Sequence, residues 1–214
     1  MLYLCKQKDM DNNKSFWQRV SKLYNWGVSA AGSGLFPTLA ERICADWQGS
    51  ERVLELACGS GQLTLLTAPR CAALTATDFA PNMVAEAKKR AESNYPNLSF
   101  GVEDATALTF ADGTFDCVVI SNALHIMPEP EKALAEIRRV LRTGGKLYAP
   151  TFVYQTDRRY LFPRLFALAG FKVYHRWTEA QLLSLIDEAG FEIAQHEVMP
   201  SGISEMAYIA GKKK

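Results

Sequence analysis

The chain has 214 residues, of which 48% are hydrophobic, and a formal net charge of +1. This length and composition fit one domain with a substantial core and leave room for an N-terminal extension. The near-neutral charge gives no general reason to expect nucleic acid or an acidic membrane surface as a partner.

The five cysteines and three histidines are scattered, with no CxxC pair. No zinc-ligand spacing appears, so no metal site is expected, and buried reduced thiols in a cytoplasmic protein are the plain interpretation. No apolar run approaches the ~20 residues that cross a bilayer, so no transmembrane segment is expected. Lys6 and Lys8 leave no room for a signal-peptide core. The sequence does not indicate the oligomeric state.

A strand, a glycine-containing loop and a helix are predicted in succession early in the chain. Residues 52–57 are apolar and β-rich, residues 58–61 form the loop, and a helix begins at Gln62. This order is the nucleotide-binding corner of a doubly wound sheet, where glycines allow a sharp turn and the close approach of a ligand. Thr64 stands where a dinucleotide site has a third glycine. The Glu55 carboxylate would repel a diphosphate and suits a cation such as a sulfonium.

The same segment resembles the first motif of the class I S-adenosylmethionine-dependent methyltransferases, of the small-molecule type with a methyltransferase-11-like domain. That motif, an acidic residue followed by alternating glycines, stands here as Glu55, Ala57, Gly59 and Gly61. Ala57 replaces the first glycine, which is tolerable if its φ is negative. The resemblance covers roughly residues 51–212. It implies S-adenosyl-L-methionine as cofactor, S-adenosyl-L-homocysteine as product, and cofactor contacts from this loop, Cys58 included.

Strands and helices alternate along the rest of the chain. Further strands are predicted at residues 73–78, 98–104, 115–123 and 146–152. One helix is predicted to begin at Pro81. Another covers residues 130–142 and is ended by Gly144–Gly145. A third begins at a capping box of Thr178 and Gln181 and runs to Gly190. Residues 192–198 and 207–210 are expected to pair antiparallel. The prediction is an α/β fold: a doubly wound, seven-stranded, mostly parallel sheet of the Rossmann-like methyltransferase type, with the last strand antiparallel.

Asp78 ends the second predicted strand and could accept both ribose hydroxyls of an adenosine. The alternatives are a helix N-cap or a solvated loop acid. Phe79 beside it could pack on the adenine face or belong to the core. Met83, on the apolar face of the next helix, is a further candidate for contact with the cofactor.

Two more strand ends carry candidates through the family resemblance. Asp104 and Ala105 match the adenine-binding position, the first through its carboxylate and the second through its backbone N–H, although the neighbouring Glu103 could be the turn acid instead. Ser121 and Asn122 match the positions that follow the fourth strand and contact the methionyl part of the cofactor.

His125 lies in the same loop and is the candidate catalytic residue. An unperturbed imidazole titrates near neutrality and could act as a general base. The alternative is a hydrogen-bonded loop histidine, because methyl transfer is an SN2 displacement driven mainly by positioning and need not require a base.

The two least regular segments are expected to cover the site. Residues 1–50 would form an N-terminal helical cap, with the Tyr24 hydroxyl near the methionine carboxylate of the cofactor, or else an aromatic face packed on the core. Residues 51–214 would form the methyltransferase domain, with an acceptor-cover insertion at about 152–177 that is dense in aromatic and cationic side chains. A solvated basic connector is the alternative for that insertion. The terminal Lys212–Lys214 are expected to be a solubilising tail.

The sequence thus predicts methyl transfer from S-adenosylmethionine to a small-molecule acceptor, apolar or aromatic with acidic or oxygen groups. A nicotinamide oxidoreductase is disfavoured by Thr64 and Glu55. Two alternatives stay open: a cofactor-binding protein without catalysis, and a methyltransferase that acts on a lipid or quinone at the membrane surface. The acceptor, and whether its O, N, S or C atom is methylated, is not predicted.

Overall fold

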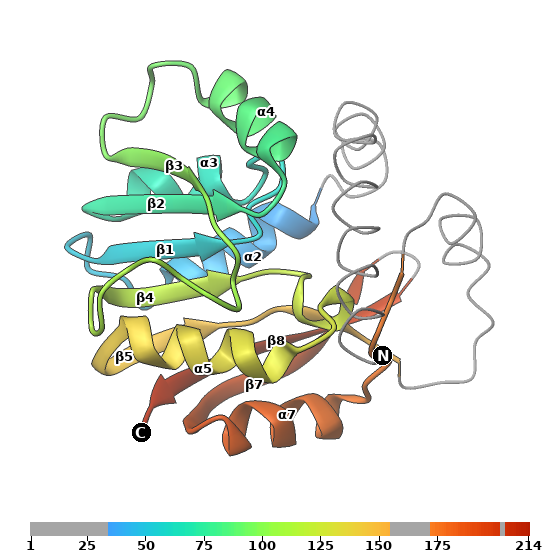
Figure 1. Cartoon of the computed structure of the whole chain (residues 1–214). Coiled ribbons are helices and arrows are strands. Elements are labelled where there is room, and N and C mark those ends of the chain that lie inside the picture. The colour runs from blue at the N-terminus through green and yellow to red at the C-terminus, as the bar shows by residue number, and fades with distance from the viewer. Residues whose placement is uncertain (1–33, 155–171, 202–203) are drawn as a thin grey trace, which may run out of the picture.

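A computed structural model describes residues 34–154, 172–201 and 204–214 (Figure 1). In this part of the chain eight strands form one sheet in the order β3-β2-β1-β4-β5-β8-β6, with β7 paired to β8. The strands are β1 (Arg52–Leu56), β2 (Ala73–Asp78), β3 (Leu98–Val102), β4 (Phe115–Ile120), β5 (Leu141–Tyr148), β6 (Thr151–Val153), β7 (Phe191–Ser201) and β8 (Ser204–Lys213). Strands β3, β2, β1, β4 and β5 are parallel, and β8 runs antiparallel to β5, β6 and β7.

Helices cover both faces of the sheet, as a doubly wound fold requires (Figure 1). The described helices are α2 (Leu35–Cys44), α3 (Thr64–Thr67), α4 (Pro81–Ala91), α5 (Pro130–Val140) and α7 (Glu179–Glu188), with 3-10 turns η1 (Ala68–Arg70) and η2 (Leu124–Ile126). Apolar residues of α5 and α7 share one buried cluster with Leu54 and Val118. Those of α2 share the other with Val53 and Val119. The predicted α/β fold class is confirmed.

Strands β5 and β6 are the two halves of the single fifth strand that the sequence predicts. The pairing of Lys146 with Lys212 and that of Val153 with Glu205 belong to one continuous register along β8. Between the two halves the Ala149 N–H donates to the Ile209 carbonyl at 2.9 Å. Pro150 has no N–H to contribute, so the ladder is interrupted there. The eight assigned strands therefore correspond to the seven predicted ones.

The predicted boundary between helix α5 and strand β5 is wrong. Helix α5 ends at Val140, and Leu141 is already extended, with φ −73° and ψ 136°. Gly144–Gly145 do not stop the helix: they lie inside β5, where the pairing with β4 shifts register and Gly144 has φ +72°. Gly144 accommodates this irregularity because glycine adopts positive φ at little steric cost, and a Cβ on Gly145 would lie 2.9 Å from the Arg142 carbonyl oxygen.

The terminal lysines are not a tail, which corrects a second expectation. Lys212 lies in β8 between Lys146 of β5 and Glu192 of β7. Lys213 Nζ donates to the Leu141 carbonyl at 2.6 Å. Lys214 Nζ lies 2.7 Å from Asp187 Oδ1 and completes the contact between the end of the sheet and α7.

Several local signals are confirmed. Pro81 is the first residue of α4, and the capping box of Thr178 and Gln181 starts α7. β7 and β8 pair antiparallel, as expected for the two final strands. The four cysteines within the described residues are free and buried.

Candidate cofactor and acceptor site

Several of the predicted site residues, among them Gly59, Asp78 and Asn122, lie at one edge of the sheet. β1 pairs in parallel with β2 on one side and β4 on the other, so their carboxyl ends lie side by side (Figure 1). The loop after β1 is joined to the end of β2 by a 2.9 Å hydrogen bond from the Gly59 N–H to Asp78 Oδ2. Ser121 and Asn122 follow β4 directly. This is the edge where open α/β sheets bind ligands.

The glycine loop has one packed side and one open side. Gly61 has φ +83°, and a Cβ on it would lie 3.3 Å from the Ala87 Cβ of α4. Gly59 has φ +55°, and a Cβ there would meet nothing within 4 Å. Arg90 of α4 braces the loop by donating to the Ser60 carbonyl at 2.9 Å. The close approach at Gly61 is therefore made by a helix, while Gly59 leaves room for a ligand.

Ala57 occupies the left-handed region of backbone space, with φ +53°. The sequence suggested that an alanine is tolerable here if its φ is negative, and this condition is not met. An L-residue with a Cβ in this conformation costs roughly 1–2 kcal/mol. The loop keeps the shape of a glycine motif, and the alanine is strained within it.

We expect Ala57→Gly to raise the free energy of unfolding by about 0.5–1 kcal/mol, because relief of strain exceeds the entropy lost by glycine. Ala76→Gly is the matched control, since Ala76 is buried in the neighbouring strand and is absent from the positive-φ residues. That control is expected to lose about 1 kcal/mol. Urea unfolding measures both, and an Ala57→Gly variant less stable than the wild type would contradict the strain.

Glu55 is almost completely buried, with 3% of its surface exposed. Burial raises the pKa of its carboxyl to about 8, with the nearby Thr64 hydroxyl opposing the shift and Asp78 adding to it. Glu55 Oε2 and Thr64 Oγ1 are both buried without a well-aligned hydrogen-bond partner among the described residues. The sequence argument assumed an ionised Glu55, whereas the ligand-free protein holds it mostly protonated at neutral pH.

Asp78 is also buried, with 6% of its surface exposed, and is neither of the alternatives considered for it. The N-cap of α4 is Ala80, whose N–H donates to Asp78 Oδ1 at 2.9 Å. Burial raises the pKa of Asp78 to about 6, and the hydrogen bonds from Ala80 and Gly59 limit the rise. Each carboxylate oxygen can accept a second hydrogen bond. Asp78 thus braces the loop and retains acceptor capacity for two ligand hydroxyls.

The third acid, Asp104, lies in a turn after β3 and is exposed. Its Oδ1 accepts from the Thr106 N–H at 2.9 Å and the Thr106 hydroxyl at 2.7 Å. Glu103 accepts from both the N–H and the hydroxyl of Thr109, so both acids make turn contacts. Ala105 is buried between them and the core. The adenine role of Asp104 and Ala105 stays a prediction.

Ser121 and Asn122 present polar atoms that the described residues do not satisfy. Ser121 Oγ and Asn122 Oδ1 are buried without a hydrogen-bond partner there. Asn122 has φ +54° and is held by its N–H, which donates to the Pro150 carbonyl at 2.8 Å. Asparagine tolerates this conformation better than most residues.

His125 lies in η2 and is buried, with 5% of its surface exposed. Burial and the neighbouring His175 lower the pKa of its imidazole to about 4. Its ring packs edge-on against Phe152, with 5.8 Å between ring centroids. The catalytic assignment of His125 stays a prediction, and this environment makes the imidazole a weak base at neutral pH.

The remaining candidates differ in what the structure shows. Cys58 is buried and donates its N–H to the Thr77 carbonyl at 2.9 Å, and burial raises the pKa of its thiol. Phe79 is half-buried and Met83 is fully buried. Tyr24 and most of the acceptor cover, residues 155–171, lie outside the described residues.

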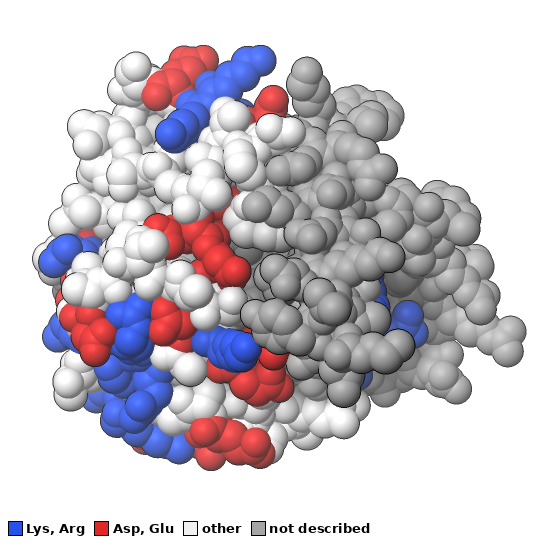
Figure 2. All heavy atoms as spheres, in the orientation of Figure 1, with Lys and Arg blue, Asp and Glu red and all other residues white. Residues whose placement is uncertain are grey.

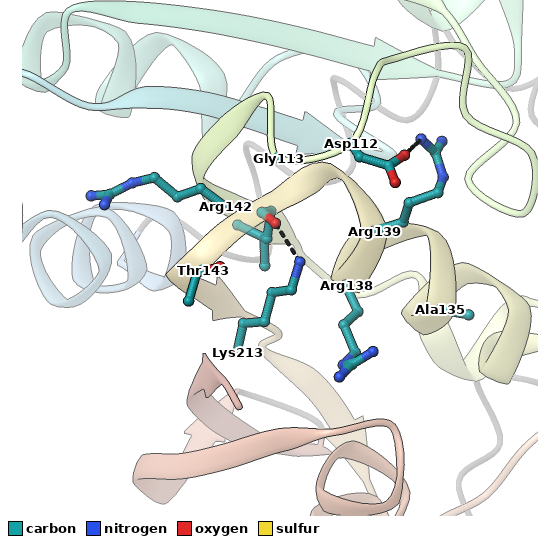
Figure 3. Close-up of a pocket in the computed structure, with 9 residues that line it drawn as sticks. Asp112, Gly113, Ala135, Arg138, Arg139, Arg142, Thr143 and Lys213 are labelled. Carbon is teal, nitrogen blue, oxygen red and sulfur yellow. Dashed lines mark hydrogen bonds and ion pairs between the residues drawn. The ribbon is translucent and has the colours of Figure 1, made fainter.

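A separate cavity of about 460 Å³ lies at the opposite end of the sheet, near the start of β5 (Figure 3). Two of its cations form ion pairs: Arg139 pairs with Asp112 and Glu136 at 2.8 Å each, and Arg142 pairs with Asp116. In Figure 2, the part of the surface where basic side chains gather also carries acidic side chains. The side chains around this cavity link α5 to the sheet, and the cavity is not the candidate site.

Comparison with known proteins decides the family. A family described as "Methyltransferase domain" matches residues 53–145. The ubiquinone/menaquinone biosynthesis C-methyltransferase of Roseobacter denitrificans is 30% identical over 186 residues, which cover 74% of each chain. The chain belongs to the S-adenosylmethionine-dependent methyltransferase family. The predicted recognition of this family is confirmed.

Two further comparisons concern the extent of the likeness. The demethylmenaquinone methyltransferase of Thermus thermophilus is 41% identical over 104 residues, which are 48% of this chain and 47% of that protein. The chain thus aligns with less than half the length of the first curated relatives. Phosphoethanolamine N-methyltransferase 2 of Haemonchus contortus, solved with S-adenosyl-L-methionine, superposes with a TM-score of 0.72 at 15% identity, over 86% of this chain and 53% of that one. This likeness shows the fold. Among the described residues, no helix has the length and apolar character needed to span a bilayer.

Sequence reasoning missed two contributors to the site. Thr64 was used only as a departure from glycine, yet its buried hydroxyl lies near Glu55. His175 was counted only among the aromatic residues of the cover. Its relation to His125 depends on a contact between distant parts of the chain, which no local pattern signals.

Proposed function

We propose that this chain transfers the methyl group of S-adenosylmethionine to a small aromatic acceptor of the hydroquinone class. The observation that supports it best is the set of buried polar atoms without partners near the glycine loop and after β4: Glu55 Oε2, Thr64 Oγ1, Ser121 Oγ and Asn122 Oδ1. An unsatisfied buried polar group costs roughly 1–3 kcal/mol, so such a set indicates a place for a polar ligand.

The residues at this edge fit the cofactor. Asp78 would hold the ribose hydroxyls, and the open face at Gly59 would admit the ligand beside the loop. Asp104 and Ala105 would hold the adenine. Ser121, Asn122 and Tyr24 would hold the methionyl part. When bound, the cofactor supplies an electrophilic methyl group, and the protein contributes alignment and exclusion of water.

The acceptor class rests on the relatives and on the aromatic side chains near the end of β4. Relatives are named for methylation of demethylmenaquinone, a quinone. Phe152 packs on His125, and Trp177 stacks on His175, so the described part of the proposed cover is aromatic. An aromatic wall with a few polar atoms suits a flat, oxygen-bearing ring. Residues 1–50 and about 152–177 would cover this ring, and the free, buried cysteines support a cytoplasmic location.

The proposal is tested by anaerobic incubation of the chain with S-adenosylmethionine and a 1,4-naphthohydroquinone that carries one short prenyl chain. We expect a methylated product by mass spectrometry and an equal amount of S-adenosylhomocysteine. Calorimetry runs in parallel. Binding of S-adenosylmethionine with no methylation of the hydroquinone would contradict the acceptor class and favour a cofactor-binding protein without catalysis. Absence of cofactor binding would contradict the whole proposal.

A further inference from the structure

Two of the three histidines of the chain lie together beyond the end of β4. The backbone N–H groups of Tyr174 and His175 both donate to the His125 carbonyl at 3.0 Å. This contact brings the segment before α7 against the loop after β4.

Both rings carry a buried nitrogen without a partner. His125 Nδ1 and His175 Nε2 have no hydrogen-bond partner among the described residues, and Ser121 Oγ and Asn122 Oδ1 share this state a few residues before His125. Buried polar atoms are nearly always satisfied in native proteins. The cofactor would occupy Ser121 and Asn122, so the two imidazole nitrogens, which lie on two segments in contact, indicate a further polar ligand here, such as a hydroxyl-bearing ring.

The two imidazoles differ in how well they can hold a proton. His125 is fully buried and meets Phe152 edge-on, so a positive charge on it would be strongly desolvated. The His175 ring is half-buried and stacks on Trp177, with 4.7 Å between centroids and 10° between planes. The face of an indole attracts a cation. Of the two rings, His175 is the one that is partly exposed and lies on an indole face.

The charged neighbours of His175 are engaged elsewhere. Lys172 Nζ lies 4.6 Å from the centroid of the Tyr174 ring, and the Arg176 guanidinium lies 5.7 Å from that of Tyr154. On the loop after β4, which packs against this segment, His125 is the titratable group that faces His175. These contacts leave the Nε2 edge of His175 to the ligand.

We propose that His175 binds a ring hydroxyl of the acceptor and takes its proton, while His125 positions His175 through its carbonyl. The inference rests on the proposed function. Each methylation replaces one proton of the acceptor by a methyl group, so one proton must leave. The hydroxyl O–H bond breaks, its electron pair stays on the acceptor oxygen, and the proton forms an N–H bond at Nε2. If the oxygen is methylated, this pair forms the new O–C bond and S-adenosylhomocysteine leaves. If a ring carbon is methylated, the pair is delocalised to that carbon, which forms the new C–C bond as S-adenosylhomocysteine leaves; the carbon then loses its own proton and the oxygen takes one back from Nε2. The acceptor is then a phenol or hydroquinone.

The kinetic test compares His175→Gln with the wild type on the prenylated 1,4-naphthohydroquinone. We expect kcat to fall on the order of a hundredfold, with loss of the acid limb of the pH profile, because the base is gone. The dissociation constant of S-adenosylhomocysteine should stay unchanged. His125→Asn should keep the acid limb. His196→Gln is the matched control, since His196 is exposed and pairs with Glu179 on the surface.

Kinetics of His175→Gln within a few fold of the wild type, with the acid limb intact, would overturn the inference and leave the proposed function standing. No methylation by the wild type would overturn both.

A binding measurement on the wild type does not depend on the variant folding. Labelling the three histidines at Cε1 with carbon-13 should give three resolvable NMR signals. With S-adenosylhomocysteine bound, addition of the hydroquinone should shift the His175 signal and leave that of His196 in place. An unmoved His175 signal under saturating hydroquinone would overturn the inference.

Discussion

Glu55→Gln is expected to make the protein without ligand more stable than the wild type at alkaline pH. At acidic pH the difference in the free energy of unfolding between variant and wild type should be smaller. Burial raises the pKa of Glu55 from 4.5 to about 8. The unfolded chain therefore releases this proton at lower pH than the folded chain does. The stabilising contribution of the protonated carboxyl is complete below its unfolded pKa and is lost as the pH rises through the folded value. A glutamine does not titrate and avoids this loss.

The size of the effect follows from the shift. Each pKa unit corresponds to about 1.36 kcal/mol, so we expect the variant to gain roughly 2–4 kcal/mol over the wild type between about pH 5 and about pH 8. Urea unfolding at the two pH values measures it. Glu131→Gln is the control, because Glu131 is exposed in the first turn of α5 and should change stability by under about 1 kcal/mol at either pH. An equal difference between Glu55→Gln and wild type at both pH values would contradict the buried, protonated carboxyl.

The same substitution should weaken the cofactor. A bound sulfonium or ammonium cation favours the ionised carboxylate, which glutamine cannot supply. We expect the dissociation constant of S-adenosylmethionine to rise about tenfold. Glu55 would then be a residue that lowers stability and is kept for binding.

Asp78→Ala is expected to weaken S-adenosylhomocysteine binding by roughly 1.5–3 kcal/mol, or about 10–150-fold. The ribose hydroxyls lose a charged acceptor, and the Gly59 and Ala80 N–H groups lose theirs. Asp78→Asn keeps one oxygen acceptor, so its dissociation constant should lie between those of the wild type and Asp78→Ala. Asp112→Ala, at the opposite end of the sheet beside Arg139, is the control and should bind as the wild type does. An unchanged dissociation constant in a folded Asp78→Ala protein would show that the ribose assignment is wrong.

Sequence patterns predicted the elements whose signals are local. β2 has the predicted bounds because its short β-prone run and the acid that ends it are adjacent in the sequence. The starts of α4 and α7 follow from a proline and a capping box. The end of α5 could not be predicted in this way. Leu141 continues the apolar period of the helix, but it pairs with Phe115 of β4, a tertiary contact that outweighs local preference.

The candidate site shows the same division. Asp78 ends β2 as predicted, and parallel strands present their carboxyl ends at one edge, while the roles of the three acids stay predictions. The positive φ of Ala57 and the protonation of Glu55 depend on the surroundings of those residues in the folded protein. The contact between His125 and the segment around His175 joins two loops far apart in the chain, so only the structure reveals it.

The central claim is that the polar edge around Glu55, Asp78 and Asn122 holds a methyl donor and delivers its methyl group to a hydroquinone. The most direct test is a single-turnover reaction with S-adenosylmethionine labelled isotopically in its methyl group and the prenylated 1,4-naphthohydroquinone. The account predicts that the label appears in the hydroquinone product, with one S-adenosylhomocysteine formed for each label transferred. Label that stays in S-adenosylmethionine, although calorimetry shows that it binds, would contradict the account.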